Sequence, residues 1–150
     1  MLRLLYLLPI LFFTLSIYAQ SASKVSWKYS AKKLEADQYE IRLSATIQPG
    51  WHLYSQNQTK DAIALPTTIQ FNKNPLATLS GKIKEVGKLY DEVEKATKTR
   101  SRFYKETVDF VQVVTLKGQA KTAITGEIEF MVCDDKQCLP PETVKFSVKL

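Results

Sequence analysis

The sequence contains few of the residues from which most enzyme sites are built. Its 150 residues include two cysteines and one histidine. No nucleophile elbow, phosphate-binding loop or HExxH pair is present, so hydrolysis and phosphoryl transfer have no support. Structural zinc sites usually take four ligands in paired cysteine and histidine spacings. Two cysteines with one histidine far away in the sequence do not match that pattern, and we expect no metal.

The amino terminus has the features of an export signal. One positive charge, at Arg3, precedes an apolar run over residues 4–17, which is shorter than the roughly 18 to 20 residues that span a bilayer. Small residues follow, with Ala19 as the expected cleavage point. We expect residues 1–19 to be a signal peptide, residues 20–150 to form one domain, and the protein to be periplasmic or secreted. An uncleaved membrane anchor is the alternative.

The excess of basic residues does not point to a nucleic-acid partner. The formal net charge is +6, and the basic residues are interleaved with acids over most of the length. A denser basic group lies in residues 94–106, which we interpret as a solvated hairpin because an exported protein seldom meets nucleic acid. A surface for an acidic partner is the second choice. The members of this group are Lys95, Lys98, Arg100, Arg102 and Lys105.

Apolar residues alternate with polar ones in several segments, which is typical of strands with one buried face. In residues 39–47, the positions expected to face inward are Tyr39, Ile41, Leu43, Ala45 and Ile47. Residues 122–132 repeat the alternation, with Ile124, Ile128, Phe130 and Val132 inward, and residues 144–150 show it again. Shorter candidate strands occupy residues 25–30, 51–55, 67–71, 82–89 and 107–116.

These segments predict the fold class. Within residues 107–116, Phe110 and Val111 are adjacent apolar residues, which predicts a β-bulge. Only residues 91–98 have a pattern compatible with a helical turn or two. Seven to nine short strands in about 130 exported residues predict an all-β domain, an immunoglobulin-like antiparallel β-sandwich.

The two cysteines lie five positions apart in the segment MVCDDKQCLPPE, residues 131–142. A bridge between Cys133 and Cys138 closes a short loop, and the chain-entropy estimate gives it about 2 kcal/mol, against ~4.7 for a loop of a hundred residues. Strand alternation places Cys133 opposite to Val132, so we expect its sulfur on an outer face within reach of another protein's thiolate. On spacing and exposure alone, a structural bridge and a redox pair remain equally open.

Four segments resemble the N-terminal domain of DsbD-type thiol:disulfide interchange proteins. They are PGWHLYSQ (49–56), LPTTIQF (65–71), GKLYDEV (87–93) and VCDDKQCLPPETVKFSV (132–148), and the resemblance extends over roughly residues 24–150. The run from Cys138 to Thr143, CLPPET, is the most specific part. The resemblance implies an immunoglobulin-like sandwich in the bacterial periplasm that needs no bound cofactor and takes no small-molecule substrate. Its Cys133–Cys138 pair is expected to cycle between dithiol and disulfide.

The resemblance also implies roles for five further residues. Asp91 and Glu92 match an acidic pair in a loop that caps the cysteines. Val93 takes the place where the best-known members have an aromatic cap, so we expect weaker shielding of the disulfide. Tyr54 matches an aromatic residue beside the site. His52 falls where the family often has a tyrosine, whereas its neighbours alone suggest a surface residue at the start of a strand.

Charges near the sulfurs are expected to set the reactivity of the pair. A protonated His52 would favour a thiolate, whereas nearby carboxylates oppose it. We expect the acids to dominate and to give a slow, partner-dependent dithiol. The acids in question are Asp91, Glu92, Asp134 and Asp135.

Partner proteins are expected to dock at the edge beside the sulfurs. Pro140 and Pro141 lack a backbone N–H and belong on a strand edge, which leaves room for a partner. We expect Trp51, Leu139 and Pro140 to contact it. A wider aromatic patch with Tyr54, Phe103 and Tyr104 is a further possibility.

The expected partners are thioredoxin-like periplasmic oxidoreductases and a membrane electron-transfer protein. Family domains are usually fused to a membrane domain and a thioredoxin-like domain, whereas this sequence ends at Leu150. The spacing between the cysteines is also one residue shorter than in the best-known members. We therefore expect separate redox proteins to serve it, or a changed role on the same fold.

Two hypotheses follow for the function. The first is a thiol-disulfide oxidoreductase in which an incoming thiolate attacks the bridge, preferentially at Cys138, and the second cysteine resolves the mixed disulfide. The alternative is an exported immunoglobulin-like binding module with a purely structural hairpin disulfide.

Overall fold

A computed structural model describes residues 23–118 and 121–150. The predicted signal peptide, residues 1–19, lies outside the described residues. Within the part of the chain that is described, no helix is long and apolar enough to cross a membrane. The segment 91–98, in which a helical turn was conceivable, instead ends a long strand and enters a turn.

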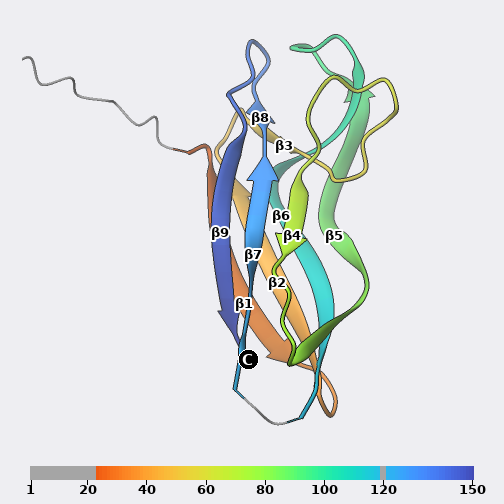
Figure 1. Ribbon diagram of the computed structural model, residues 1–150. Helices are drawn as coiled ribbons and strands as arrows, with labels where there is room; N and C mark the ends of the chain where they lie inside the picture. Colours follow the sequence, from red (N-terminus) through yellow and green to blue (C-terminus); the bar gives the residue numbers. More distant parts are fainter. Residues whose placement is uncertain (1–22, 119–120) are drawn as a thin grey trace, which may run out of the picture.

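One sheet has six strands (Figure 1). They run in the order β1-β2-β6-β3-β8, and β5 pairs with the other edge of β6. The strands of this sheet are β1 (Val25–Lys33), β2 (Gln38–Ile47), β3 (His52–Tyr54), β5 (Ala77–Val93), β6 (Arg100–Leu116) and β8 (Val132–Cys133). The long hairpin of β5 and β6 carries the solvated basic group on its turn and on the start of β6, as predicted.

The second sheet has three strands and covers the first. It is built from β4 (Thr68–Phe71), β7 (Ala123–Phe130) and β9 (Glu142–Lys149), in the order β4-β7-β9. Every pairing in both sheets is antiparallel. The two sheets face each other in Figure 1, which confirms the predicted all-β antiparallel sandwich.

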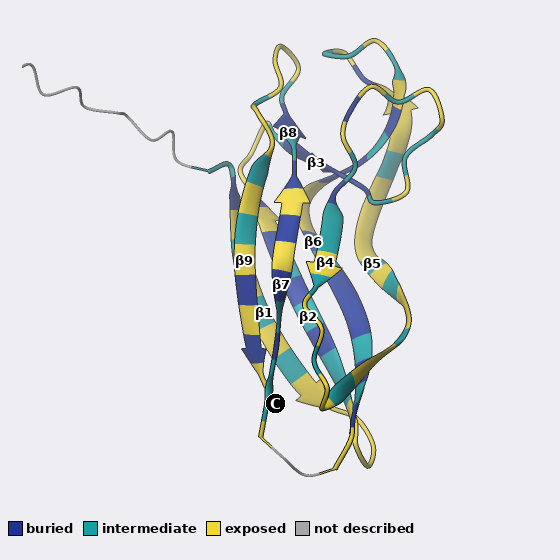
Figure 2. Ribbon diagram, viewed as in Figure 1, coloured by how far each residue is buried: buried dark blue, intermediate teal, exposed yellow. Residues whose placement is uncertain are grey.

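The core lies between the sheets, where every second residue of a strand points inward. Figure 2 shows this alternation as buried and exposed bands along β7. On β2 the predicted inward face is confirmed, because Ile41, Leu43, Ala45 and Ile47 are buried and Tyr39 is half-buried against the core. On β7 the buried apolar side chains are Ile124, Ile128 and Phe130, also as predicted.

The predicted bulge at Phe110 and Val111 is wrong. Both residues keep a continuous register with β2, where they face Leu43 and Arg42. Both are buried although they point to opposite faces of β6, so the adjacent apolar pair reflects a strand that is covered on both sides. The β5–β6 ladder does have an irregular step opposite Val111 and Val113, but its extra residues lie on β5, between Ser80 and Lys84. A second irregular step lies between Gly87 and Leu89, which pair with Val108 and Tyr104.

The chain changes sheets at Met131, and this step positions the cysteines. Phe130 ends β7 in the three-stranded sheet, and Val132 begins β8 in the six-stranded sheet. Val132 is buried in the main core. Cys133 follows it on β8, opposite His52 on β3.

We predict that Gly126→Ala destabilises the fold. A Cβ at this position of β7 would lie 2.6 Å from Cζ of Phe146 and would also meet the backbone oxygen of Gln70. Neither the ring nor the β4 backbone can move away freely, so we expect a loss of about 1–3 kcal/mol in the free energy of unfolding. Urea denaturation measures it. Glu127→Ala, on the exposed side of β7, is the control, and an equal effect of both substitutions would contradict the packing argument.

Candidate functional site

The disulfide joins the two ends of a short turn after β8. Cys133 and Cys138 are bonded, and their backbones form an isolated antiparallel bridge with the Cα atoms 4.0 Å apart. Asp134 holds the turn, because its Oδ1 accepts the backbone N–H of Lys136 and of Gln137, each at 2.8 Å. These two hydrogen bonds lower the pKa of the Asp134 carboxyl.

The two cysteines have opposite exposure. Cys138 is exposed, whereas Cys133 is 0% exposed, so the expectation that Cys133 lies on an accessible outer face is wrong. Its side chain does point away from the main core, as alternation from Val132 requires. That face is closed by a second, smaller cluster of buried residues. Its fully buried members besides Cys133 are Tyr54, Ala64 and Phe103.

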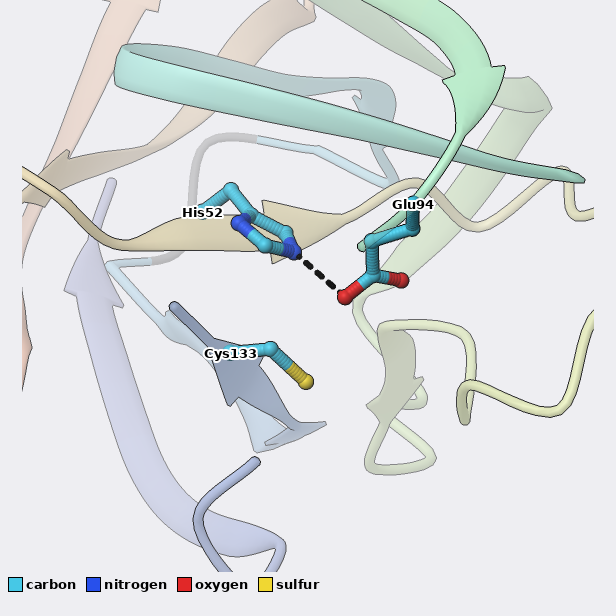
Figure 3. Close-up of side chains that lie close together, drawn as sticks. All are labelled: His52, Glu94 and Cys133. Atoms are coloured by element: carbon cyan, nitrogen blue, oxygen red, sulfur yellow. Dashed lines mark hydrogen bonds and ion pairs between the residues drawn. The ribbon is translucent and has the colours of Figure 1, made fainter. Parts of the chain in front are cut away.

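A buried polar group lies against the sulfur of Cys133 (Figure 3). The Nε2 atom of His52 is 3.0 Å from Oε1 of Glu94, and the hydroxyl of Tyr54 donates to the same oxygen at 2.7 Å. Thr97 donates to the other carboxylate oxygen, Oε2, at 3.1 Å. Ligand atoms of His52, Glu94 and Cys133 all lie within 4.8 Å of one another. We refer to His52, Tyr54 and Glu94 as the buried polar group.

His52 is not a surface residue, so the interpretation from its neighbours alone is wrong. It lies beside the sulfurs, as the resemblance implied. His52 is 4% exposed, and its ring packs against Phe103 with 4.4 Å between ring centroids. Burial lowers the pKa of His52, and the neighbouring Glu94 carboxylate only partly opposes this. The imidazole therefore brings no fixed positive charge to the sulfur near neutral pH. Burial and the hydrogen bond to Glu94 raise the pKa of Tyr54.

The acidic residues of the β5–β6 hairpin divide between two faces. Asp91 is bound by Arg100 at 2.8 Å and by Arg102 at 3.1 Å, and these bonds lower the pKa of its carboxyl. Glu92 and Val93 instead line a pocket of about 280 Å³ together with His52 and Asp135. Val93 is 66% exposed, so this small cap leaves the pocket open.

Glu94 is the acid that sequence reasoning missed. It is 4% exposed and touches the site directly, whereas Asp91 and Glu92, which the resemblance singled out, are exposed. Strand alternation was the available signal, because Tyr90, Glu92 and Glu94 occupy positions of the same parity. Tyr90 stacks on the buried Phe103, which identifies this face of the hairpin as the one that covers the site.

The rim of the site combines apolar and charged side chains. Trp51 is half-buried and lines a second pocket that also touches His52 and Asp135. Leu139 is half-buried and Pro140 is exposed, on the other side of Cys138. Tyr54, Phe103 and Tyr104 are all buried, so they take no part in an exposed aromatic patch.

One exposed ion pair links the two turns that border the site. Lys95, on the turn between β5 and β6, binds Asp135, on the cysteine turn, at 2.6 Å. This contact lowers the pKa of Asp135 and raises that of Lys95. Both side chains are largely exposed, so the pair adds little to stability. It holds the hairpin close to the cysteine turn.

We predict that the protein loses stability in mildly acidic solution. Because burial lowers the pKa of His52 in the folded state, the unfolded chain takes up the proton first as the pH falls through about 6.5. The free energy of unfolding should therefore drop in this range. His52 is the only histidine, and no other side chain ordinarily titrates between about pH 5 and 7. Urea denaturation of wild type and His52→Gln across this range tests it, and equal pH slopes would contradict the prediction.

Comparison with known proteins agrees with this geometry. The family described as Thiol:disulfide interchange protein DsbD, N-terminal, matches residues 19–150. No curated protein matches the sequence at a significant level.

Two solved structures are similar to this chain. The N-terminal periplasmic domain of ScsB from Proteus mirabilis has a TM-score of 0.54 and 14% identity, and the match covers 84% of this chain and 44% of that one. The N-terminal domain of Neisseria meningitidis DsbD in the reduced form has a TM-score of 0.43 and 16% identity, covering 75% of this chain and 77% of that one. The family match extends over the whole described domain, including the disulfide and the buried polar group beside it. The chain therefore belongs to the family of N-terminal domains of the thiol:disulfide interchange protein DsbD.

Proposed function

We propose that this protein exchanges disulfides with partner proteins in the periplasm through a reversible Cys133–Cys138 bond. The observation that carries the proposal is the asymmetry of the bond, with one sulfur in an exposed residue and the other buried beside a histidine and a carboxylate. A partner can reach only one end, so the order of events is set by the fold. The family to which the chain belongs supports this chemistry.

In the first step, a partner thiolate attacks Sγ of the exposed Cys138. A new bond forms between the partner sulfur and Cys138, the Cys133–Cys138 bond breaks, and its electron pair leaves on Cys133. In the second step, another partner thiolate attacks the partner's own sulfur in the mixed disulfide. The partner leaves with a disulfide, and this protein holds a dithiol. The reverse sequence passes the two electrons to a second partner that enters with a disulfide.

The buried polar group acts on the sulfur that is freed in the first step. Cys133 lies among apolar and aromatic side chains, with the Glu94 carboxylate nearby. A buried carboxylate disfavours a neighbouring thiolate, so the reduced pair is held as a thiol that reacts slowly with arbitrary disulfides. Nε2 of the neutral His52 imidazole donates to the Glu94 carboxylate and so helps to hold that carboxylate beside the sulfur. Selectivity for docked partners follows from this arrangement.

The rim residues are proposed to receive the partner. Leu139 and Pro140 follow the exposed Cys138 in the chain, and Trp51 lines a pocket that reaches Asp135 on the cysteine turn. Glu92 and Val93 line a second pocket that also reaches Asp135. Thioredoxin-like oxidoreductases and a membrane electron-transfer protein are the proposed partners. Export is proposed on the apolar amino-terminal segment and on the similarity to the ScsB domain, which is described as periplasmic.

Single-cysteine variants test the order of attack. In Cys133→Ala, the remaining Cys138 is exposed, whereas Cys138→Ala leaves only the buried Cys133. We expect Cys133→Ala to react with Ellman's reagent faster by an order of magnitude or more, and to accumulate mixed disulfides with thioredoxin-like proteins. As the control, the two variants should react with Ellman's reagent at the same rate once they are denatured. Faster reaction of Cys138→Ala in the native state would overturn the assignment of Cys138 as the attacked residue.

The reduction potential separates exchange from a structural bridge. Equilibration in thiol buffers, followed by alkylation of free thiols, should give a value of about −200 to −270 mV, in the range of exchange proteins. A value below about −300 mV is typical of structural disulfides. It would support an exported binding module in place of the proposed oxidoreductase.

A further inference from the structure

Three side chains around the disulfide offer a set of metal ligands that the exchange reaction does not require. His52, Glu94 and Cys133 come from β3, from the turn after β5 and from β8, and Figure 3 shows them close together. Their ligand atoms lie within 4.8 Å of one another, and all three residues are buried. Because imidazole, carboxylate and thiolate are all zinc ligands, the set is chemically consistent.

The carboxylate is already oriented by other groups. Tyr54 donates to Oε1 of Glu94 and Thr97 donates to Oε2, so both oxygens are fixed by the protein. Hydrogen bonds of this kind hold the ligands of metal sites in position. Binding of Zn²⁺ replaces the 3.0 Å hydrogen bond between Nε2 of His52 and Oε1 of Glu94, while Tyr54 and Thr97 keep the carboxylate in place.

Cys138 supplies a fourth ligand only after reduction. In the disulfide neither sulfur is a thiolate, so the oxidised protein has just an imidazole and a carboxylate to offer. Once the bond is reduced, Cys138 stays beside Cys133 because their Cα atoms are 4.0 Å apart on bridged backbones. Since Cys138 is exposed, its thiolate can bind an ion directly from solvent.

We propose that the reduced protein binds one Zn²⁺ ion through Cys133, Cys138, His52 and Glu94, and that the disulfide prevents this binding. A reductant delivers two electrons and two protons to the disulfide. The two thiols then release two protons as Zn²⁺ binds, and the ion itself undergoes no redox change. Bound Zn²⁺ withholds both sulfurs from exchange. The inference rests on the proposed function only in requiring that the bond can be reduced.

Cobalt titration of the chain tests the site. The protein is reduced with tris(2-carboxyethyl)phosphine, by unfolding and refolding if the native bond resists, and the reductant is removed without air. We expect one equivalent of Co²⁺ to bind with a thiolate-to-cobalt absorption band, and Zn²⁺ to displace it. The oxidised protein should show no band. A native bond that resists reduction would count against exchange, whereas absence of the band in the refolded dithiol would overturn the zinc site alone.

Variants at the two non-sulfur ligands give the second readout. His52→Gln and Glu94→Gln should each weaken Zn²⁺ binding by about 10- to 100-fold. Glu129→Gln, an exposed residue on β7, is the control and should bind as the wild type does. Zn²⁺ should also raise the melting temperature of the reduced wild type and not that of the oxidised protein. Unchanged affinity in both ligand variants, or an equal thermal shift in both redox states, would contradict the proposal.

Discussion

The two-residue ladder between β3 and β8 determines the geometry of the site. Val132 pairs with Leu53, and Cys133 pairs with His52. Because alternate residues of a strand face opposite sides, this register sends Val132 into the main core and Cys133 into the smaller cluster. A slip by one residue would exchange them and would separate the sulfur from the histidine. The short strand β8 thus matters more to function than its length suggests.

The buried polar group explains why the β5–β6 hairpin stays over the disulfide. A buried carboxylate without partners is costly, so Glu94 must keep its hydrogen bonds for the fold to tolerate it. The bonds from His52 and Tyr54 tie the hairpin turn to β3, and Thr97 adds one from within the turn. The exposed Lys95–Asp135 pair adds little by comparison. The cap is therefore anchored from within, and the outer ion pair only adjusts its position.

The same group gives the two sulfurs different chemistry. Cys138 is exposed to solvent, whereas Cys133 is buried near an imidazole, a carboxylate and aromatic rings. A symmetric, fully exposed bridge would react at either end with any thiol. Burial of one end makes reactivity depend on which protein docks and from which side. The buried position of Cys133, on which the proposed selectivity depends, also brings its sulfur close to His52 and Glu94, the proposed metal ligands.

The sequence by itself determined the core-facing residues of the strands and indicated the family. Alternation in residues 39–47 and 122–132 determined which residues line the core, because strand periodicity is a local property. The CLPPET segment and its neighbours indicated the family, which the match over residues 19–150 confirms. The resemblance of the segment 49–56 to the family also predicted that His52 and Tyr54 lie near the cysteines.

Only the tertiary structure decided how the sulfurs are covered. Alternation gave the direction of the Cys133 side chain correctly, but the covering residues Ala64 and Phe103 come from distant segments of the chain. Strand alternation gave the face on which Glu94 lies, but its contact with His52 and Tyr54 depends on a hairpin that folds back over β3. Side-chain direction is set by the strand itself, whereas burial is set by whatever packs against it.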